Sequence, residues 1–302
     1  MMRIGTRGSQ LALWQANHIA ALLRAAGHSV EIEVIRTTGD LLQEVTFAEV
    51  GTKSMFTLEI EQALAEGRID LAVHSLKDLP TTLPEGFVLA ATPPRVDPRD
   101  VLVSVHPRSL FDLPEGARIG TSSLRRRAQL RALRSDLETV EFRGNVDTRL
   151  RKLAEGQVDA ILLAAAGLDR LEKTTWLRER IPPEQICPAA GQGALGIESR
   201  IDDARTRAAL AFLDDSATRF AVTAERTALA ALGGGCQVPV GVHCRALVGG
   251  QAEIFAIVAD PSGDPLLRAH ATGSDPLALG YAVSDQLLRL GAADLLAGAS
   301  RP

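Results

Sequence analysis

The sequence predicts an α/β protein in which two doubly wound domains surround a cleft and a small C-terminal α+β domain contains a three-stranded antiparallel sheet. Strand and helix patterns alternate through the first two-thirds of the 302 residues, as in doubly wound folds. Two segments rich in proline or glycine cross between the α/β halves. The last third replaces this alternation with strands that are joined by tight turns.

The first domain is predicted to contain residues 1–95 together with 194–214. A helix begins after Ser9, whose hydroxyl can cap it, and ends at Gly27. A second helix is expected at 55–67, and the segment 93–100 (PPRVDPRD) is rich in turn residues and predicts the first crossing. Strands are expected at 3–7, 30–36 and 69–75, and the last is an apolar run typical of a buried parallel strand.

The second domain is predicted to span residues 96–193. A strand, a tight turn and a helix are expected within 117–134. They are followed by a strand at 137–143, a helix at 147–156 and a buried strand at 158–164. The glycine-rich segment 188–198 predicts the second crossing, and two crossings indicate a hinge.

The third domain is predicted to span residues 215–302. A helix is expected at 217–232, and three glycines then precede Cys236. Gly249-Gly250 predicts a two-residue hairpin turn, and Asp275-Pro276 predicts the start of the final helix. Strands are expected near 238–248, 252–259 and 266–272.

Composition excludes several classes of function. The net charge of −4 argues against a general nucleic-acid surface. No apolar run reaches the ~18 residues of a membrane helix, and the N-terminus has no apolar signal region, so we expect a cytoplasmic protein without membrane contact. Three cysteines do not make a disulfide framework, and no histidine or cysteine spacing fits a metal site.

Polar residues follow several of the predicted strands, where open α/β sheets bind ligands. These residues are Arg7, Ser9, His74, Ser75, Lys77, Asp78, Thr121, Ser122, Ser123, Arg125, Arg126, Arg143 and Asn145, with Gln192 in the second crossing. Lys77 and Asp78 allow three interpretations: a surface ion pair, a Schiff-base lysine, or a carboxylate that stabilises a cation and moves protons. The local pattern does not separate them.

The segment GTSSLRRR at 120–127 indicates an anion site at a helix N-terminus. Arginine binds carboxylates through two parallel hydrogen bonds. Because successive helical residues are ~100° apart, the three arginines cannot all face one ligand, and we expect Arg125 and Arg126 to do so. Only four of the 33 basic residues of the chain are lysines, so arginine dominates throughout.

Cys236 follows a run of glycines, which leaves its thiol accessible. Cys244 lies in a strand pattern and Cys187 beside a proline, so both are interpreted as structural. A lone cysteine is more often inert than functional, and the local sequence does not decide the role of Cys236.

Eight motifs in order resemble the porphobilinogen deaminase family, also called hydroxymethylbilane synthases. They are TRGSQLALWQA (6–16), VHSLKDLP (73–80), GTSSLRRR (120–127), RGNVDTRL (143–150), LLAAAGLDRL (162–171), PAAGQGALGIE (188–198), VTAER (222–226) and GGGCQVP (233–239). The segment GTKSMF at 51–56 departs from the glycine-rich loop common in the family, although it keeps Lys53. The behaviour of residues 41–56 as a lid is therefore open.

The resemblance implies a transferase that joins four porphobilinogen molecules into hydroxymethylbilane, in haem and tetrapyrrole biosynthesis. It implies a dipyrromethane cofactor, bound covalently through a thioether to Cys236 in the third domain, and a monomer. It makes Asp78 the catalytic carboxylate. Cofactor binding falls to Lys77, Thr121, Ser123, Arg125 and Arg126, and substrate binding to Arg7, Ser9, Lys53, Arg143, Arg149 and Arg170.

Two other classes of function share some of these features. Two α/β halves with a hinge are also the architecture of periplasmic binding proteins, which bind small anions reversibly without chemistry. The lack of a signal region and the GGGCQVP segment argue against that class. A nucleic-acid binder that uses the arginine-rich helix is disfavoured by the net charge and the 4% aromatic content.

Overall fold

The computed structural model describes residues 1–37, 57–106, 109–234 and 238–299. The chain divides into two compact units. Unit 1 contains Met1–Val96 and Ala194–Arg219, and unit 2 contains Asp97–Gly193 and Phe220–Pro302. The predicted second and third domains thus both belong to unit 2, apart from a few residues at their ends, and the division into three domains stays a prediction.

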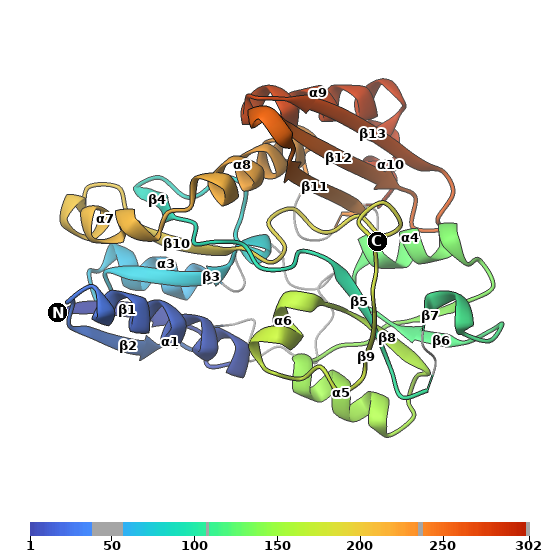
Figure 1. The fold of residues 1–302 in the computed structure, drawn as a ribbon, viewed down its shortest axis with the longest axis horizontal. Helices are drawn as coiled ribbons and strands as arrows, with labels where there is room; N and C mark the ends of the chain where they lie inside the picture. Colours follow the sequence, from blue (N-terminus) through green and yellow to red (C-terminus); the bar gives the residue numbers. More distant parts are fainter. Residues whose placement is uncertain (38–56, 107–108, 235–237, 300–302) are drawn as a thin grey trace. The chain divides into compact units, whose positions relative to one another are not determined.

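Unit 1 is built on a five-stranded sheet with the order β2-β1-β3-β10-β4 (Figure 1). Its strands are β1 (Met2–Thr6), β2 (Val30–Val34), β3 (Leu71–Ser75), β4 (Phe87–Ala91) and β10 (Leu195–Arg200). The first three are parallel, whereas β10 runs antiparallel to both β3 and β4. The sheet therefore needs a strand that lies about 100 residues beyond the others.

Helices cover both faces of this sheet because its central strands are apolar on both sides. On β3, Leu71 and Val73 pack in the cluster that includes α1, whereas Ala72 packs in the cluster that includes α3. The Ser9 hydroxyl caps α1 by accepting a hydrogen bond from the backbone N–H of Ala12 at 3.2 Å, as predicted. The helices of this unit are α1 (Gln10–Ala25), α3 (Leu58–Ala65), α7 (Ala204–Leu210) and the 3₁₀ turns η1 (Leu76–Asp78) and η3 (Ala211–Leu213).

Unit 2 contains a second five-stranded sheet with the equivalent order, β7-β6-β8-β5-β9. Its strands are β5 (Asp100–Ser104), β6 (Arg118–Gly120), β7 (Glu138–Val140), β8 (Ala160–Ala164) and β9 (Leu177–Arg180), and its helices are α4 (Leu124–Leu133), α5 (Val146–Ala154), α6 (Ala165–Arg170) and the turn η2 (Leu110–Asp112). Here β5 is the strand that runs antiparallel to its neighbours β8 and β9. Leu102 and Leu162 pack with Leu130 of α4, and the alternate residues Val101 and Ile161 pack on the opposite face.

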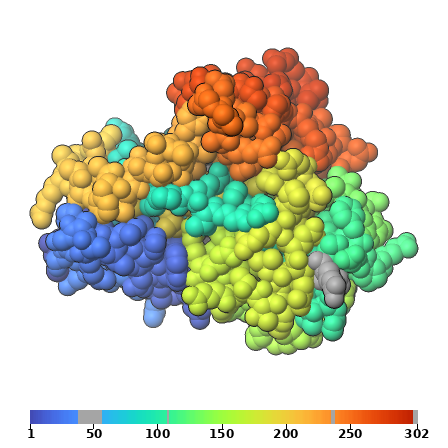
Figure 2. All heavy atoms as spheres, in the orientation of Figure 1, coloured from blue at the N-terminus to red at the C-terminus, as the bar shows by residue number. Residues whose placement is uncertain are grey.

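The C-terminal part of unit 2 is a three-stranded antiparallel sheet. It consists of β11 (Val240–Ala246), β12 (Ala252–Ala259) and β13 (Leu266–Gly273), with α8 (Ser216–Ala231), α9 (Pro276–Arg289), α10 (Ala292–Ala299) and the turn η4 (Val248–Gly250). Ala224 and Ala228 of α8 and Val283 and Leu287 of α9 share one apolar cluster with the strands. Residues of this part form one continuous surface in Figure 2, in orange to red.

The hairpin between β12 and β13 docks on helix α4 of the same unit. Arg131 of α4 donates a hydrogen bond to the Pro261 carbonyl at 3.0 Å. Gly263 has a φ of +96°, and a Cβ at that position would lie 2.7 Å from Cβ of Arg131 and 2.8 Å from the backbone nitrogen of Ala132. Only glycine allows both this conformation and this approach.

The predicted fold class is confirmed, with differences in detail. Strands β4, β5, β9 and β10 and helices α6 and α7 were not predicted as elements. The expected two-residue turn at Gly249-Gly250 is wrong, because the Leu247 N–H donates to the Gln251 carbonyl at 2.7 Å and closes a three-residue loop. The final helix is two helices, which are separated at Leu290 and Gly291. Within the described residues, no helix has the length and apolarity that crossing a membrane requires.

Candidate functional site

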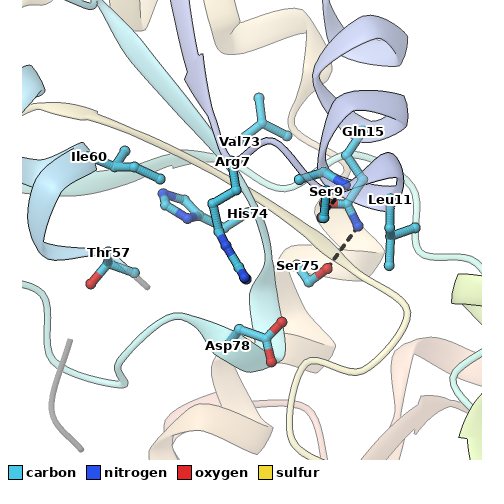
Figure 3. Close-up of a pocket in the computed structure, with 11 residues that line it drawn as sticks. Arg7, Ser9, Leu11, Gln15, Thr57, Ile60, Val73, His74, Ser75 and Asp78 are labelled. Atoms are coloured by element: carbon cyan, nitrogen blue, oxygen red, sulfur yellow. Dashed lines mark hydrogen bonds between the residues drawn. The ribbon is translucent and has the colours of Figure 1, made fainter. Parts of the chain in front are cut away.

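The carboxyl ends of β1 and β3 bring three predicted site residues of unit 1 together. Because β1 and β3 are parallel neighbours, the residues that follow them emerge at the same edge of the sheet. Arg7 and Ser9 follow β1, and Asp78 ends the 3₁₀ turn that follows β3. All three line one pocket (Figure 3), so the predicted convergence of these residues is found in unit 1.

This pocket has a volume of about 80 Å³. In Figure 3 the side chain of Arg7 extends toward the carboxylate of Asp78. The Gln15 side-chain amide donates to the Ser75 hydroxyl at 2.8 Å and fixes it at the pocket wall. Asp78 is exposed and Arg7 is half-buried, so a cation and a carboxylate face the same small space. The remaining lining residues are Leu11, Ala12, Thr57, Ile60, Val73 and His74.

A buried histidine–glutamate pair adjoins the pocket. His74 and Glu198 project from β3 and β10 on the face that α3 covers, and His74 Nε2 lies 3.0 Å from Glu198 Oε2. Both side chains are buried, as is Glu61 of α3. Burial raises the pKa of Glu61, and the neighbouring Glu198 carboxylate raises it further. The pocket wall at His74 thus rests on two buried acids, Glu61 and Glu198.

The predicted anion-binding turn of unit 2 joins β6 to α4. Gly120 ends β6, and a Cβ there would lie 2.6 Å from the Phe142 ring, so glycine permits this close approach. The Thr121 hydroxyl accepts a hydrogen bond from the Ser123 N–H at 3.2 Å. The Ser123 hydroxyl in turn accepts from the Arg126 N–H and caps the helix. Thr121 and Ser123 therefore shape the turn that presents Arg125 and Arg126.

Arg125 and Arg126 both bind the carboxylate of Asp100. Arg125 Nη1 donates to Asp100 Oδ2 at 2.7 Å, and Arg126 donates to Oδ1 from Nη2 at 2.7 Å and from Nε at 3.1 Å. Asp100 has no exposed surface, and the two arginines are 4% and 6% exposed. Burial alone would raise the pKa of Asp100, but the charges of Arg125 and Arg126 hold it well below its usual range. As predicted, the neighbouring Arg127 points elsewhere and pairs with Glu141.

The other predicted arginines of unit 2 have different environments. Arg143 pairs with Glu141 at 2.8 Å. Arg170 ends α6, is buried, and donates to the Gly193 carbonyl at 2.9 Å. Arg149 on α5 has a buried Nε that meets no hydrogen-bond acceptor among the described residues.

Burial lowers the pKa of Arg149 and of Arg170 to about 10. For Arg149 the charge of Arg126 lowers the pKa further, whereas the charge of Glu141 raises it. Arg125 and Arg126 place two positive charges on the one carboxylate of Asp100, which therefore balances only part of their charge.

The remaining predicted residues fall into three groups. Lys53, Cys236 and the possible lid at 41–56 lie outside the described residues. Lys77 is described and half-buried, but it is not among the residues that line the pocket. Cys187 and Cys244 are buried, and burial raises the pKa of Cys187 to about 12, which keeps its thiol protonated.

Sequence reasoning missed Asp100 and the partner of His74. Asp100 ends the turn-rich segment 93–100, and it also heads the apolar run DVLVSV. A carboxylate at the start of a buried strand needs charged partners. The aspartate at the head of this apolar run was therefore the sequence signal for such partners. Glu198 interrupts the apolar strand β10 in the same way. The sequence offered no sign that His74 would be its partner, 124 residues away.

Comparison with known proteins gives one consistent result. Residues 2–208 match the family described as "Porphobilinogen deaminase, dipyromethane cofactor binding domain", and residues 219–289 match "Porphobilinogen deaminase, C-terminal domain". The chain is 48% identical over 297 residues to the porphobilinogen deaminase of Brevibacillus brevis, which covers 98% of this chain and 96% of that protein. It is 51% identical over 299 residues to that of a Roseiflexus species, with 98% of each chain covered.

A solved structure with a more distant likeness is a nutrient binding protein from Burkholderia cenocepacia bound to methionine. It is 14% identical, covers 70% of this chain and 90% of that chain, and has a TM-score of 0.45.

Proposed function

The chain belongs to the porphobilinogen deaminase family, and from this premise we propose that it joins four molecules of porphobilinogen head to tail into hydroxymethylbilane. One ammonia leaves at each addition. The activity is that of a transferase in tetrapyrrole biosynthesis, known as hydroxymethylbilane synthase. The observation that carries the proposal is the convergence of Arg7 and Asp78 on one pocket, in a chain that matches the family along nearly its whole length.

The proposed role of Asp78 follows from the charges that form in the reaction. When the carbon–nitrogen bond of the aminomethyl group breaks, its electron pair leaves with the ammonia nitrogen and a positive charge spreads over the pyrrole ring. A carboxylate ~4 Å from that charge, at an effective dielectric of ~20, stabilises it by about 4 kcal/mol. Asp78 can bind the pyrrole N–H and, once the new carbon–carbon bond has formed, accept the proton that the attacking ring carbon loses.

The proposed role of the arginines follows from the charge of the substrate. Each porphobilinogen unit has an acetate and a propionate group, so the product is a polyanion. A charge-assisted hydrogen bond contributes roughly 1.5–3 kcal/mol, and several of them hold such a chain. We assign substrate binding to Arg7, Ser9, Lys53, Arg143, Arg149 and Arg170, and cofactor binding to Lys77, Thr121, Ser123, Arg125 and Arg126.

The residues of unit 2 fit a dipyrromethane cofactor. Its carboxylates require an excess of positive charge, and Arg125 and Arg126 on the single carboxylate of Asp100 supply one. When bound, the cofactor supplies the terminal pyrrole carbon to which the first substrate is joined. We propose that a thioether to Cys236 attaches it, and that the enzyme acts as a monomer in the cytoplasm, with porphobilinogen as its small-molecule partner.

Intact mass spectrometry of the purified protein tests the function and the attachment site together. We expect the wild type to be heavier than its sequence by two pyrrole units and Cys236→Ser to have the mass of the bare chain. Cys244→Ala is the matched control, because Cys244 is buried in strand β11 and should leave the added mass in place. An active wild type without the added mass would contradict the proposal.

A further inference from the structure

The buried carboxylate of Asp100 binds two side chains, Arg125 and Arg126, that leave their helix in different directions. Arg125 and Arg126 are consecutive residues of α4, so their side chains leave the helix ~100° apart. Both nevertheless end on Asp100, one on each carboxylate oxygen, at 2.7 Å. Asp100 can reach them because it lies on β5 on the face that α4 covers, as its neighbour Leu102 does. The carboxylate therefore determines where the two guanidinium groups lie.

Asp100 is itself fixed by the two segments that cross between the halves of the fold. It is the first residue of β5, directly after the first crossing, and pairs with Ala164 at the carboxyl end of β8. Gln192 of the second crossing donates from Nε2 to Asp100 Oδ1 at 2.8 Å and to the Pro98 carbonyl at 2.7 Å. Both carboxylate oxygens thus have defined donors, and the group has little freedom to turn.

The charge of this cluster leaves room for an anion. Two guanidinium groups on one carboxylate retain a net positive charge. Buried ion pairs contribute little net stability compared with apolar residues of similar volume, so stability alone does not explain an aspartate here. Asp100 reduces the repulsion between the two arginines without cancelling their charge. The two guanidinium groups therefore stay close together and can bind a carboxylate ligand.

The two arginines differ in how many of their N–H groups remain to bind that ligand. Arg126 donates from all three of its guanidinium nitrogens. Its Nε and Nη2 bind Asp100, and its Nη1 binds the Leu162 carbonyl at 3.1 Å. Among the described residues, Arg125 donates only from Nη1, to Asp100 and to the Cys187 carbonyl. The Nε–Nη2 edge of Arg125 is the edge that matches a carboxylate in a two-bond contact.

We propose that Asp100 is a positioning residue of this enzyme, which holds Arg125 and Arg126 in the orientation that binds the carboxylates of the cofactor. The inference rests on the proposed function of these two arginines. Its physical basis is preorganisation: an arginine that is already ordered loses less side-chain freedom when the ligand binds. Asp100 makes no contact with the ligand in this role.

The experiment is intact mass spectrometry of Asp100→Asn, combined with thermal unfolding. We expect the fraction of folded protein with the two-pyrrole mass to fall roughly tenfold, because two charge-assisted contacts lose their geometry. Asp97→Asn is the matched control. Asp97 also pairs with two arginines, Arg99 at 2.7 Å and Arg180 at 2.9 Å, but not with Arg125 or Arg126. It should keep the full adduct.

Gln192→Met decides the question if Asp100→Asn does not yield folded protein. It keeps every charge and removes the hydrogen bond that fixes Asp100, so the fraction of folded protein with the two-pyrrole mass should fall about threefold while the unfolding midpoint stays close to that of Asp97→Asn. Asp100→Glu should restore part of the adduct that Asp100→Asn loses. A folded Asp100→Asn with the full adduct, or a Gln192→Met with the full adduct, overturns the inference.

Arg125→Gln and Arg126→Gln separate this inference from the proposed function. If both variants keep the two-pyrrole mass, the assigned role of the arginines is wrong, and the role of Asp100 falls with it. If they lose the mass while Asp100→Asn keeps it, the proposed function stands and only the positioning role is rejected.

Discussion

Asp78 in unit 1 and Asp100 in unit 2 are carboxylates of equal chemistry in opposite environments. Asp78 is exposed in a short 3₁₀ turn beside a pocket, opposite the half-buried Arg7. Asp100 has no exposed surface and accepts hydrogen bonds from two arginines and a glutamine. An exposed carboxylate can meet a substrate and exchange protons, whereas a buried and fully paired one can only hold its neighbours in place.

The two aspartates share one position relative to the strands of their sheets. Each aspartate lies at the edge of its sheet where parallel strands end, which is the edge that binds ligands in such folds. Position in the fold therefore does not tell them apart. The number of charged groups that each carboxylate already binds does tell them apart. Substitution of Asp78 should therefore lower turnover, whereas substitution of Asp100 should leave its two arginine partners less ordered.

The largest effect is expected for Asp78→Asn, which should lower turnover roughly a thousandfold, the equivalent of about 4 kcal/mol. Its free energy of unfolding should change by no more than about 0.5 kcal/mol, because the side chain is exposed. Rates of product formation and urea denaturation measure the two quantities. Asp202→Asn, an exposed change in the same unit, serves as control. Near-normal turnover would remove the proposed contrast between the two aspartates.

A smaller effect is expected for Arg149→Leu, which tests the proposed role of Arg149 in substrate binding. Loss of one charge-assisted contact should weaken chain building about tenfold. The lengths of the protein-bound pyrrole chains, measured by intact mass under limiting substrate, report this loss. Arg151→Leu is the control on the same helix, since Arg151 is exposed and pairs with Glu155. Equal chain lengths in both variants would place Arg149 outside the site.

The smallest effect is expected for Glu61→Gln, which tests the two buried acids on which the pocket wall of unit 1 rests. Folding raises the pKa of Glu61 above 4.5, so the folded state binds this proton more tightly than the unfolded chain. The wild type should therefore lose stability relative to the variant as the pH rises through the folded pKa. Urea denaturation from about pH 4 to about pH 8 measures this difference.

Glu66→Gln provides the baseline for this measurement, because Glu66 is exposed at the end of the same helix. If the difference between wild type and Glu61→Gln does not vary with pH, or varies in the opposite direction, Glu61 does not titrate as a buried acid.

Much of the fold could be predicted because its apolar patterns are local. The strands at β1, β2, β3 and β8 and the cap at Ser9 follow from short stretches of sequence. Strands β5 and β10 were missed because each begins beside a segment of prolines or glycines that suggests a turn. They became strands because both lie between two other strands, whose hydrogen bonds outweigh local preference.

The candidate site could be predicted where residues follow strands and not where they pair across the sheet. Arg7 and Asp78 were placed from their positions after β1 and β3. Asp100 could not be matched to Arg125 or Gln192, because the pairs are 25 and 92 residues apart and only the antiparallel direction of β5 brings them together. Pairing over such distances depends on strand order, which periodicity does not reveal.

The position of β10 has a consequence for the order in which the chain can fold during synthesis. Strand β10 lies between β3 and β4, yet it is translated after all of Asp97–Gly193. When the ribosome has made the first 96 residues, β3 and β4 still lack the strand that both must bond. The sheet of unit 2 needs only residues 100–180 and has all its strands before β10 emerges. Unit 1, most of which is synthesised first, can therefore complete its sheet only after all strands of the unit 2 sheet have been made.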